Sequence, residues 1–140
     1  MKIKKLDHLS TIFKEYDAFI IDLWGVMHDG VRLNSSAMKA VNELQLNGKR
    51  IVFLSNAPRP TKKVVEFLKK MKMEDRFLKN VLTSGEAALN SLKKNKFGKK
   101  FYHLGPQRDD SLFSDIKNNK TTLDKCDFIL CTGLFDDKSE

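Results

Sequence analysis

The sequence has 140 residues, enough for one ordinary domain, and its 41% hydrophobic and 31% charged residues give it a globular rather than a disordered composition. It contains no apolar run of about 18 residues, which excludes a transmembrane helix, and no secretory signal is evident, so we expect a cytoplasmic protein. The net charge of +8 comes mostly from lysines spread along predicted helices, without an arginine cluster or interleaved aromatic residues. We therefore expect neither nucleic acid nor a membrane as a partner.

The first part of the chain alternates predicted helices and strands. Apolar residues recur at helical spacing in the helices, and the strands are short, continuous apolar runs that suit burial on both faces. In chain order the elements are a helix over 4–15, a strand over 18–22, a helix capped by Asn34 or Ser35 and ended by Gly48, a strand over 50–54, a helix capped by Thr61, a strand over 81–83 and a helix beginning at 84–86. This alternation predicts right-handed βαβ units around a parallel sheet, and hence an α/β fold.

The second part of the chain repeats the pattern on a smaller scale. It contains a predicted strand over 101–104, a helix over about 109–118 and another strand over 128–131. The stretch 93–100, which contains lysines and a glycine, is the best candidate for a boundary between the two parts.

Two predicted strands end in polar residues. The first apolar run stops at Asp22, and Gly25 follows in a tight turn, while the second stops at Ser55 and Asn56. Ligands bind beyond the carboxyl ends of parallel strands, and neighbouring strands lie about 5 Å apart, so we expect the carboxylate and the hydroxyl to face one small volume. A hydroxyl and backbone N–H groups suit a phosphoryl oxygen, and a carboxylate can attack phosphorus when a divalent cation neutralises the charge.

These motifs resemble those of a known family. Ile-Ile-Asp-Leu-Trp-Gly-Val at 20–26 and Val-Phe-Leu-Ser-Asn at 52–56 resemble motifs one and two of the haloacid dehalogenase (HAD) superfamily. His-Asp-Gly at 28–30 and Thr-Ser-Gly-Glu-Ala-Ala at 83–88 resemble its class IIA branch, the NagD-like or para-nitrophenylphosphatase-like hydrolases. The resemblance implies a three-layer, Rossmann-like sandwich with a parallel sheet in residues 1–97, followed over 98–140 by the beginning of an α/β class II cap that selects the substrate.

The same resemblance implies a role for each motif residue. Asp22 would be the nucleophile of a phosphatase-type hydrolase that acts on a small phosphomonoester through an aspartyl-phosphate. Its second carboxylate oxygen and the backbone carbonyl of Trp24 would bind Mg²⁺. Ser55 would hold the transferring phosphoryl group, with Asn56 and Gly25 beside it in the substrate site.

The sequence departs from the family pattern immediately after the nucleophile. The family usually has a second aspartate two residues later, which acts as general acid for the leaving group and then as base for water. Here that position is Trp24, whose indole does not transfer a proton near neutral pH. Assistance typically worth about 10²–10⁴ in rate is then missing unless another group supplies it, and His28 and Asp29 are the nearest candidates.

The lysine and the late acidic pair of the family's third and fourth motifs are not visible. We therefore expect a fragment that ends inside the cap and hydrolyses phosphate esters poorly by itself. One alternative is a non-catalytic fragment that binds a phosphate ligand in the same pocket. Another is a small capless phosphatase, in which Asp136 and Asp137 are the late metal acids and Lys99 or Lys100 is the missing lysine.

The expected fragment has a structural consequence at its first strand. In the superfamily, later strands pair beside this one. Without them the strand over 18–22 is a sheet edge with free backbone N–H and C=O groups. The sequence therefore predicts self-association through an exposed edge.

Overall fold

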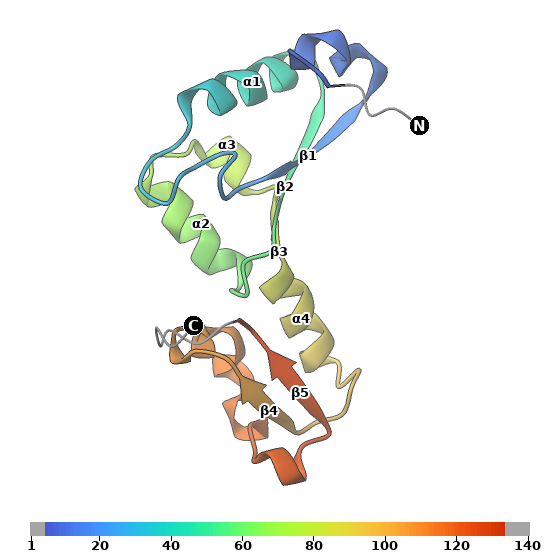
Figure 1. Cartoon of the computed structure of the whole chain (residues 1–140), viewed down its shortest axis with the longest axis vertical. Coiled ribbons are helices and arrows are strands. Elements are labelled where there is room, and N and C mark those ends of the chain that lie inside the picture. Colours follow the sequence, from blue (N-terminus) through green and yellow to red (C-terminus); the bar gives the residue numbers. More distant parts are fainter. Residues whose placement is uncertain (1–4, 134–140) are drawn as a thin grey trace.

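The computed structural model describes residues 5–133 and contains two parallel sheets (Figure 1). The first sheet has the order β1-β2-β3, formed by β1 (Ala18–Asp22), β2 (Arg50–Ser55) and β3 (Val81–Thr83). The second pairs β4 (Phe101–Leu104) with β5 (Phe128–Cys131). These bounds confirm the predicted strands and the α/β fold class, because each apolar run ends where a polar residue follows it.

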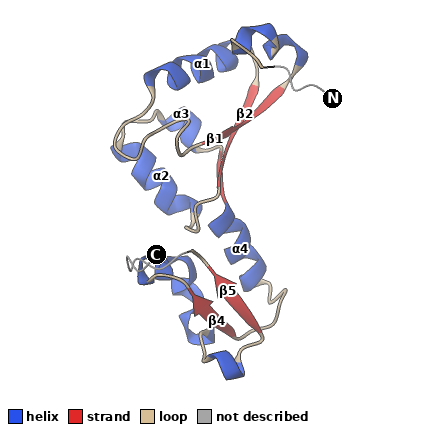
Figure 2. Ribbon diagram, in the orientation of Figure 1, coloured by secondary structure: helices blue, strands red, loops and turns tan. Residues whose placement is uncertain are grey.

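Four α-helices connect or follow the strands of the first sheet (Figure 2). They are α1 (Ser35–Leu46), α2 (Thr61–Lys70), the short α3 (Asp75–Leu78) and α4 (Ser84–Lys93). Asn34 caps α1 through its side-chain oxygen, which accepts hydrogen bonds from the N–H groups of Ser36 and Ala37. The sequence analysis did not predict α3, which has four residues and is too short to show a helical period.

The first sheet buries only one of its faces within the described residues. Its inward side chains pack with α1, α2 and α3 in a core that includes Phe53, Leu68 and Phe77, each 1% exposed or less. On the opposite face a row of apolar side chains is open to solvent, with Ile20, Leu54 and Leu82 at 74%, 49% and 53% exposure. Of the three layers expected, residues 5–133 therefore supply the sheet and one helical layer (Figure 1).

The second sheet packs with α4 and with η3 (Gln107–Asn119), a run of 3₁₀-helix. Its core contains Leu89 from α4, Phe101 from β4, and Leu112 and Phe113 from η3. The two parts of the chain therefore meet along α4, which begins directly after β3 and contributes to the second core.

Two predicted α-helices are wrong in type. Within the described part of 4–15 the structure has two single turns, η1 (Leu9–Thr11) and η2 (Phe13–Glu15), because His8 and Thr11 hydrogen-bond the local backbone and so compete with a continuous helix. The helix predicted over 109–118 is 3₁₀ and kinked at Phe113 and Ile116. This segment is rich in Asp, Ser and Asn, whose side chains favour caps and turns over helix interiors.

A last short 3₁₀ turn, η4 (Leu123–Lys125), leads into β5. Between residues 5 and 133 no helix is both long and apolar enough to cross a lipid bilayer.

Candidate functional site

Asp22 and Ser55 are the last residues of two neighbouring parallel strands. The register pairs Asp22 with Leu54, so Ser55 lies one residue further along its strand. Both residues line an open groove of about 810 Å³, together with Asn56. The Asp22 carboxylate is exposed, and its Oδ1 accepts a hydrogen bond from the Leu23 N–H at 2.7 Å. The Ser55 hydroxyl is nearly buried and accepts one from the Ala57 N–H at 3.2 Å.

The turn that follows β1 is anchored by two buried side chains, Leu23 and Met27. The Leu23 carbonyl accepts hydrogen bonds from the N–H groups of Met27 at 2.8 Å and of His28 at 3.1 Å, which closes the turn tightly over the end of the strand. Gly25 adopts φ of +75° and donates its N–H to the His28 carbonyl at 2.9 Å. The Gly25 N–H is thus already engaged, and Gly25 lines a separate small hollow rather than the groove beside Asp22.

Trp24 and His28 form an aromatic wall, and both line a second space, of about 430 Å³, that shares Ser55 and Asn56 with the groove. The Trp24 ring is 63% exposed and meets His28 edge to face, with ring centroids 5.4 Å apart. The opposite side of His28 contacts Phe67 of α2 at 5.5 Å. A Cβ at Gly30, where φ is +94°, would come within 2.7 Å of the indole, so glycine leaves room for the Trp24 ring. Trp24 therefore lies against His28 and Gly30 while most of its side chain stays exposed.

His28 is a neutral ring whose acceptor nitrogen is occupied. Burial lowers the pKa of His28 below its usual 6.5, and the charges of Asp29 and Asp22 only partly oppose this effect. The Gly30 N–H donates to His28 Nδ1 at 3.1 Å, which assigns the remaining ring proton to Nε2. Near neutral pH the ring is therefore suited to donating a hydrogen bond rather than to accepting a proton.

Asp29, the other candidate acid, is engaged in the turn. Its Oδ1 accepts hydrogen bonds from the N–H groups of Arg32 and Val31 at 2.8 and 2.9 Å, and these bonds hold the pKa of Asp29 below its usual value. A carboxylate with a lowered pKa carries no proton to give near neutral pH. Asp29 lines the same small hollow as Gly25, so the structure places neither residue on the groove beside Asp22.

The segment Thr83 to Glu86 clamps the loop that follows β2. The Thr83 hydroxyl donates to the Arg59 carbonyl at 2.7 Å, and the Ser84 hydroxyl donates to the Asn56 carbonyl at 2.8 Å. The Thr61 N–H in turn donates to the Glu86 carboxylate at 3.0 Å.

Between these bonds, Gly85 packs directly against the Arg59 backbone, with no room for a Cβ. The Thr-Ser-Gly-Glu pattern therefore fixes the loop that carries Asn56 and Arg59.

A cavity of about 430 Å³ lies between the two parts of the chain. Ser55 and Asn56 line both this cavity and the groove beside Asp22, so the two spaces meet at the end of β2. The first part of the chain also contributes Trp24, His28, Arg59 and Lys63, and the second part contributes Arg108, Asp109 and Thr132. Sequence reasoning missed Arg59 and Asp109 as lining residues, since neither belongs to a recognisable motif.

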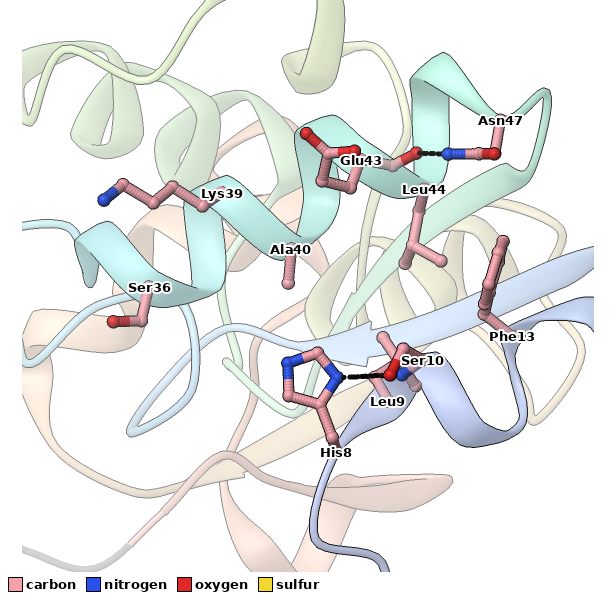
Figure 3. A pocket seen from close by; sticks show the side chains of 10 residues that line it. All are labelled: His8, Leu9, Ser10, Phe13, Ser36, Lys39, Ala40, Glu43, Leu44 and Asn47. Carbon is pink, nitrogen blue, oxygen red and sulfur yellow. Dashed lines mark hydrogen bonds between the residues drawn. The ribbon is translucent and has the colours of Figure 1, made fainter.

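Another cavity, of about 400 Å³, lies on a different part of the molecule (Figure 3). It is bounded by η1, η2 and α1, beside the residues that lead into β1 and β2, and its walls are largely apolar, with Leu9, Phe13 and Leu44 among them. The His8 ring there bonds Ser10 through Nδ1 at 2.7 Å. None of the motif residues lines it.

The described residues do not by themselves form a Mg²⁺ site. Asp22 and the Trp24 carbonyl offer two protein oxygens, and one of the carboxylate oxygens already accepts the Leu23 N–H. Between residues 5 and 133 no three His, Cys, Asp or Glu side chains are grouped as metal ligands. Mg²⁺ takes six oxygens in near-octahedral geometry, several of them from waters and substrate phosphates, so Asp22 and the Trp24 carbonyl would supply only part of its ligand set.

The two lysines of the capless alternative line neither the groove nor the cavity. Lys99 and Lys100 precede β4 and donate their backbone N–H groups to Asp127 at 2.8 Å, whereas the cavity is lined by residues that follow the strands of the second sheet. Asp136 and Asp137 lie outside the described residues.

The chain matches a known family over most of its length. The family described as "Haloacid dehalogenase-like hydrolase" matches residues 19–117. The chain belongs to this family. The match begins inside β1 and includes both strand ends, the aromatic wall and the clamp at 83–86. The family prediction made from the motifs is thereby confirmed.

Solved structures of HAD-like hydrolases extend the comparison. A haloacid dehalogenase-like hydrolase from Brucella suis 1330 is 26% identical, with a TM-score of 0.79, over 97% of this chain and 49% of that one. The p-nitrophenyl phosphatase from Archaeoglobus fulgidus is 21% identical, with a TM-score of 0.62, over 81% and 43% of the two chains. The glycerol phosphate phosphatase from Mycobacterium tuberculosis, in complex with magnesium, is 21% identical, with a TM-score of 0.60, over 89% and 38%.

These matches confirm the HAD-like α/β fold that the motifs predicted. The chain spans about half the length of the Brucella hydrolase and less than half the length of each of the two phosphatases. No curated protein sequence matches the chain.

Proposed function

We propose that this chain carries the phosphoryl-accepting part of a phosphatase site, with Asp22 as nucleophile toward a small phosphomonoester. The observation that carries the proposal is that Asp22, Ser55 and Asn56, from two adjacent parallel strands, line one groove. A HAD-like nitrophenyl phosphatase and a HAD-like glycerol phosphate phosphatase share the fold, which supports the reaction class.

In the proposed reaction an Asp22 oxygen forms a bond to phosphorus while the bond from phosphorus to the ester oxygen breaks. The Ser55 hydroxyl donates a hydrogen bond to the transferring group, and Asn56 lies beside it. Water then attacks the aspartyl-phosphate, releases inorganic phosphate and restores the carboxylate. The chemistry that Mg²⁺ supplies in such sites is charge neutralisation, and residues 5–133 do not supply its ligand set.

The leaving group determines how fast this chain hydrolyses a phosphate ester. Trp24 cannot protonate a departing alkoxide, and the one proton of the His28 ring lies on Nε2 with the pKa of the ring below 6.5. A leaving group that is stable as an anion, such as para-nitrophenolate, needs less assistance than the alkoxide of glycerol. We therefore expect slow turnover of para-nitrophenyl phosphate by this chain and none detectable for glycerol phosphate.

The test measures nitrophenolate release and phosphate-ester binding for the purified chain with Mg²⁺ present. Asp22→Asn should abolish the residual turnover, and Ser55→Ala should weaken para-nitrophenyl phosphate binding about three- to tenfold, as expected for one lost hydrogen bond. Asp75→Asn, which removes an exposed carboxylate on α3, is the matched control and should change neither quantity. Turnover that survives Asp22→Asn would contradict the assignment of the nucleophile.

A second function, binding of a phosphate ligand without turnover, is favoured by Trp24 at the position of the general acid. The two functions differ in one outcome. Binding alone would be established by three results together. The natural sequence shows no turnover, Ser55→Ala weakens its affinity for the phosphate ester, and Asp22→Asn leaves that affinity unchanged. Binding that Ser55→Ala does not change would contradict both functions.

A further inference from the structure

The cavity between the two parts of the chain is the place where the rest of the phosphoester must lie. This inference rests on the proposed function, because it begins from a phosphoryl group held between Asp22 and Ser55. Since Ser55 and Asn56 line both the groove and the cavity, an ester held there extends its alcohol portion into the cavity of about 430 Å³. The walls of that cavity then decide which alcohol portions bind.

Positive charge predominates on these walls. Three basic residues, Arg59, Lys63 and Arg108, line the cavity, whereas Asp109, which is 2% exposed, is the only acidic residue that lines it among residues 5–133. His28 adds no charge near neutral pH, because burial lowers its pKa. The cavity therefore favours an anionic occupant beyond the phosphoryl group itself.

Arg59 is the basic residue whose charge is available. Lys63 already pairs with Glu66 at 3.3 Å, whereas Arg59 is exposed and forms no ion pair with any residue between 5 and 133. A guanidinium presents paired N–H donors that match the two oxygens of a carboxylate or a phosphate.

The Arg59 backbone is also held in place, and this favours binding. Its carbonyl accepts the Thr83 hydroxyl at 2.7 Å, and the neighbouring Thr61 N–H is bound by Glu86 at 3.0 Å. Gly85 closes the contact from the other side. An arginine on a fixed backbone loses less conformational entropy on binding than one on a mobile loop. The clamp therefore gives Arg59, one of the residues that line the cavity, a rigid backbone.

We propose that the ligand of this site is a phosphomonoester with a second anionic group, a carboxylate or a second phosphate, and that Arg59 binds that group. The phosphoryl group lies at Ser55 and Asn56, and the second anion lies in the cavity. The preferred substrates are therefore phosphorylated hydroxy acids or bisphosphates rather than singly phosphorylated polyols.

The test uses ligands that differ only in the second group. Calorimetric titration of the full chain compares 3-phosphoglycerate with glycerol 3-phosphate, in which a carboxylate replaces a hydroxymethyl group. It also compares fructose 1,6-bisphosphate with fructose 6-phosphate, which distinguishes a carboxylate from a phosphate as the second anion. We expect the doubly anionic member of at least one pair to bind about tenfold more tightly, as expected for one charge-assisted hydrogen-bonded pair at a partly exposed site.

Arg59→Gln should remove this preference and change the affinity for the singly anionic member less than twofold. Arg59→Lys, which keeps the charge but not the paired donors, should retain part of the preference. Arg50→Gln, at the amino end of β2 and outside the cavity lining, is the matched control and should retain all of it. Circular dichroism melts of each variant establish that the fold is intact.

Two results would overturn the inference while leaving the proposed function intact. One is that the natural sequence binds the two members of each ligand pair with equal affinity. The other is that Arg59→Gln lowers the affinity for both members of a pair equally, which would place Arg59 at the phosphoryl group. A chain that binds none of the four esters would instead overturn the proposed function, and this inference with it.

Discussion

Gly85→Ala tests whether the clamp at 83–86 holds the loop after β2 in solution. A Cβ at this position would lie 2.5 Å from the Arg59 carbonyl oxygen and 2.6 Å from its carbonyl carbon, and it would also overlap the Arg59 nitrogen. Ordinary contact with a Cβ begins near 3.4 Å, so the Arg59 backbone would have to retreat by roughly 1 Å. Because the obstacle is backbone and not a flexible side chain, no rotamer change relieves it.

The cost of that retreat follows from the bonds it stretches. Overpacking of this kind costs roughly 1–3 kcal/mol. The Gly85 N–H bond to Ala57 and the Thr83 bond to Arg59, at 3.1 and 2.7 Å, would lengthen toward the limit of hydrogen bonding, at about 0.5–1.5 kcal/mol each. Replacing glycine by alanine in a helix otherwise gains about 1 kcal/mol. We therefore expect a net destabilisation of roughly 1–5 kcal/mol.

Thermal melts followed by circular dichroism measure the effect directly. For a chain of this size, 1 kcal/mol corresponds to roughly 3–5 °C in Tm, so Gly85→Ala should melt roughly 3–25 °C lower. Ser91→Ala in the same helix improves helix propensity without any steric conflict and should leave Tm unchanged or slightly raised. The sign of the change in Tm distinguishes a steric conflict from helix propensity, because propensity alone predicts that Gly85→Ala is stabilising. A Tm equal to or above that of the natural sequence would refute the clamp.

Two further predictions concern pH and association. Burial lowers the pKa of His28, and burial and Lys120 lower that of His103, so the unfolded chain binds protons first as the pH falls below 6.5. The free energy of unfolding should therefore decrease from pH 7 to pH 5.5, and a pH-independent Tm over that range would contradict the burial of both rings. Ile20→Lys should reduce self-association in sedimentation velocity without lowering Tm, since Ile20 is 74% exposed on an edge strand, and a natural chain that stays monomeric at high concentration would exclude such association.

The strand ends were predictable from the sequence because two signals coincide there. An uninterrupted apolar run predicts a strand, and the first polar residue after it marks the end, so Asp22 and Ser55 could be placed at one edge of a parallel sheet. Helix caps were equally local, as at Asn34. Such signals depend on a few neighbouring residues and require no knowledge of the tertiary structure.

The rest of the site depends on contacts between distant segments, which single-sequence patterns do not record. Thr83 caps α4 while bonding the Arg59 carbonyl, and only the first of these roles has a sequence signature. His28 was a candidate proton donor because it lies near the nucleophile in the sequence. Its lowered pKa follows from burial, and its ring contacts Trp24 and Phe67. Asp109 lines the cavity because η3 brings it there, and no motif surrounds it.

The open face of the first sheet and the candidate nucleophile belong to the same surface. The groove that contains Asp22 has Ile20, Leu54 and Leu82 among its lining residues, so a polypeptide that covers these apolar side chains also encloses the carboxylate. Removing water from around a charged group strengthens its interactions, because the effective dielectric constant falls. The interactions of the Asp22 carboxylate with a phosphoester are therefore weakest while this face is exposed to water. Association through the face should therefore alter phosphate-ester affinity together with oligomeric state.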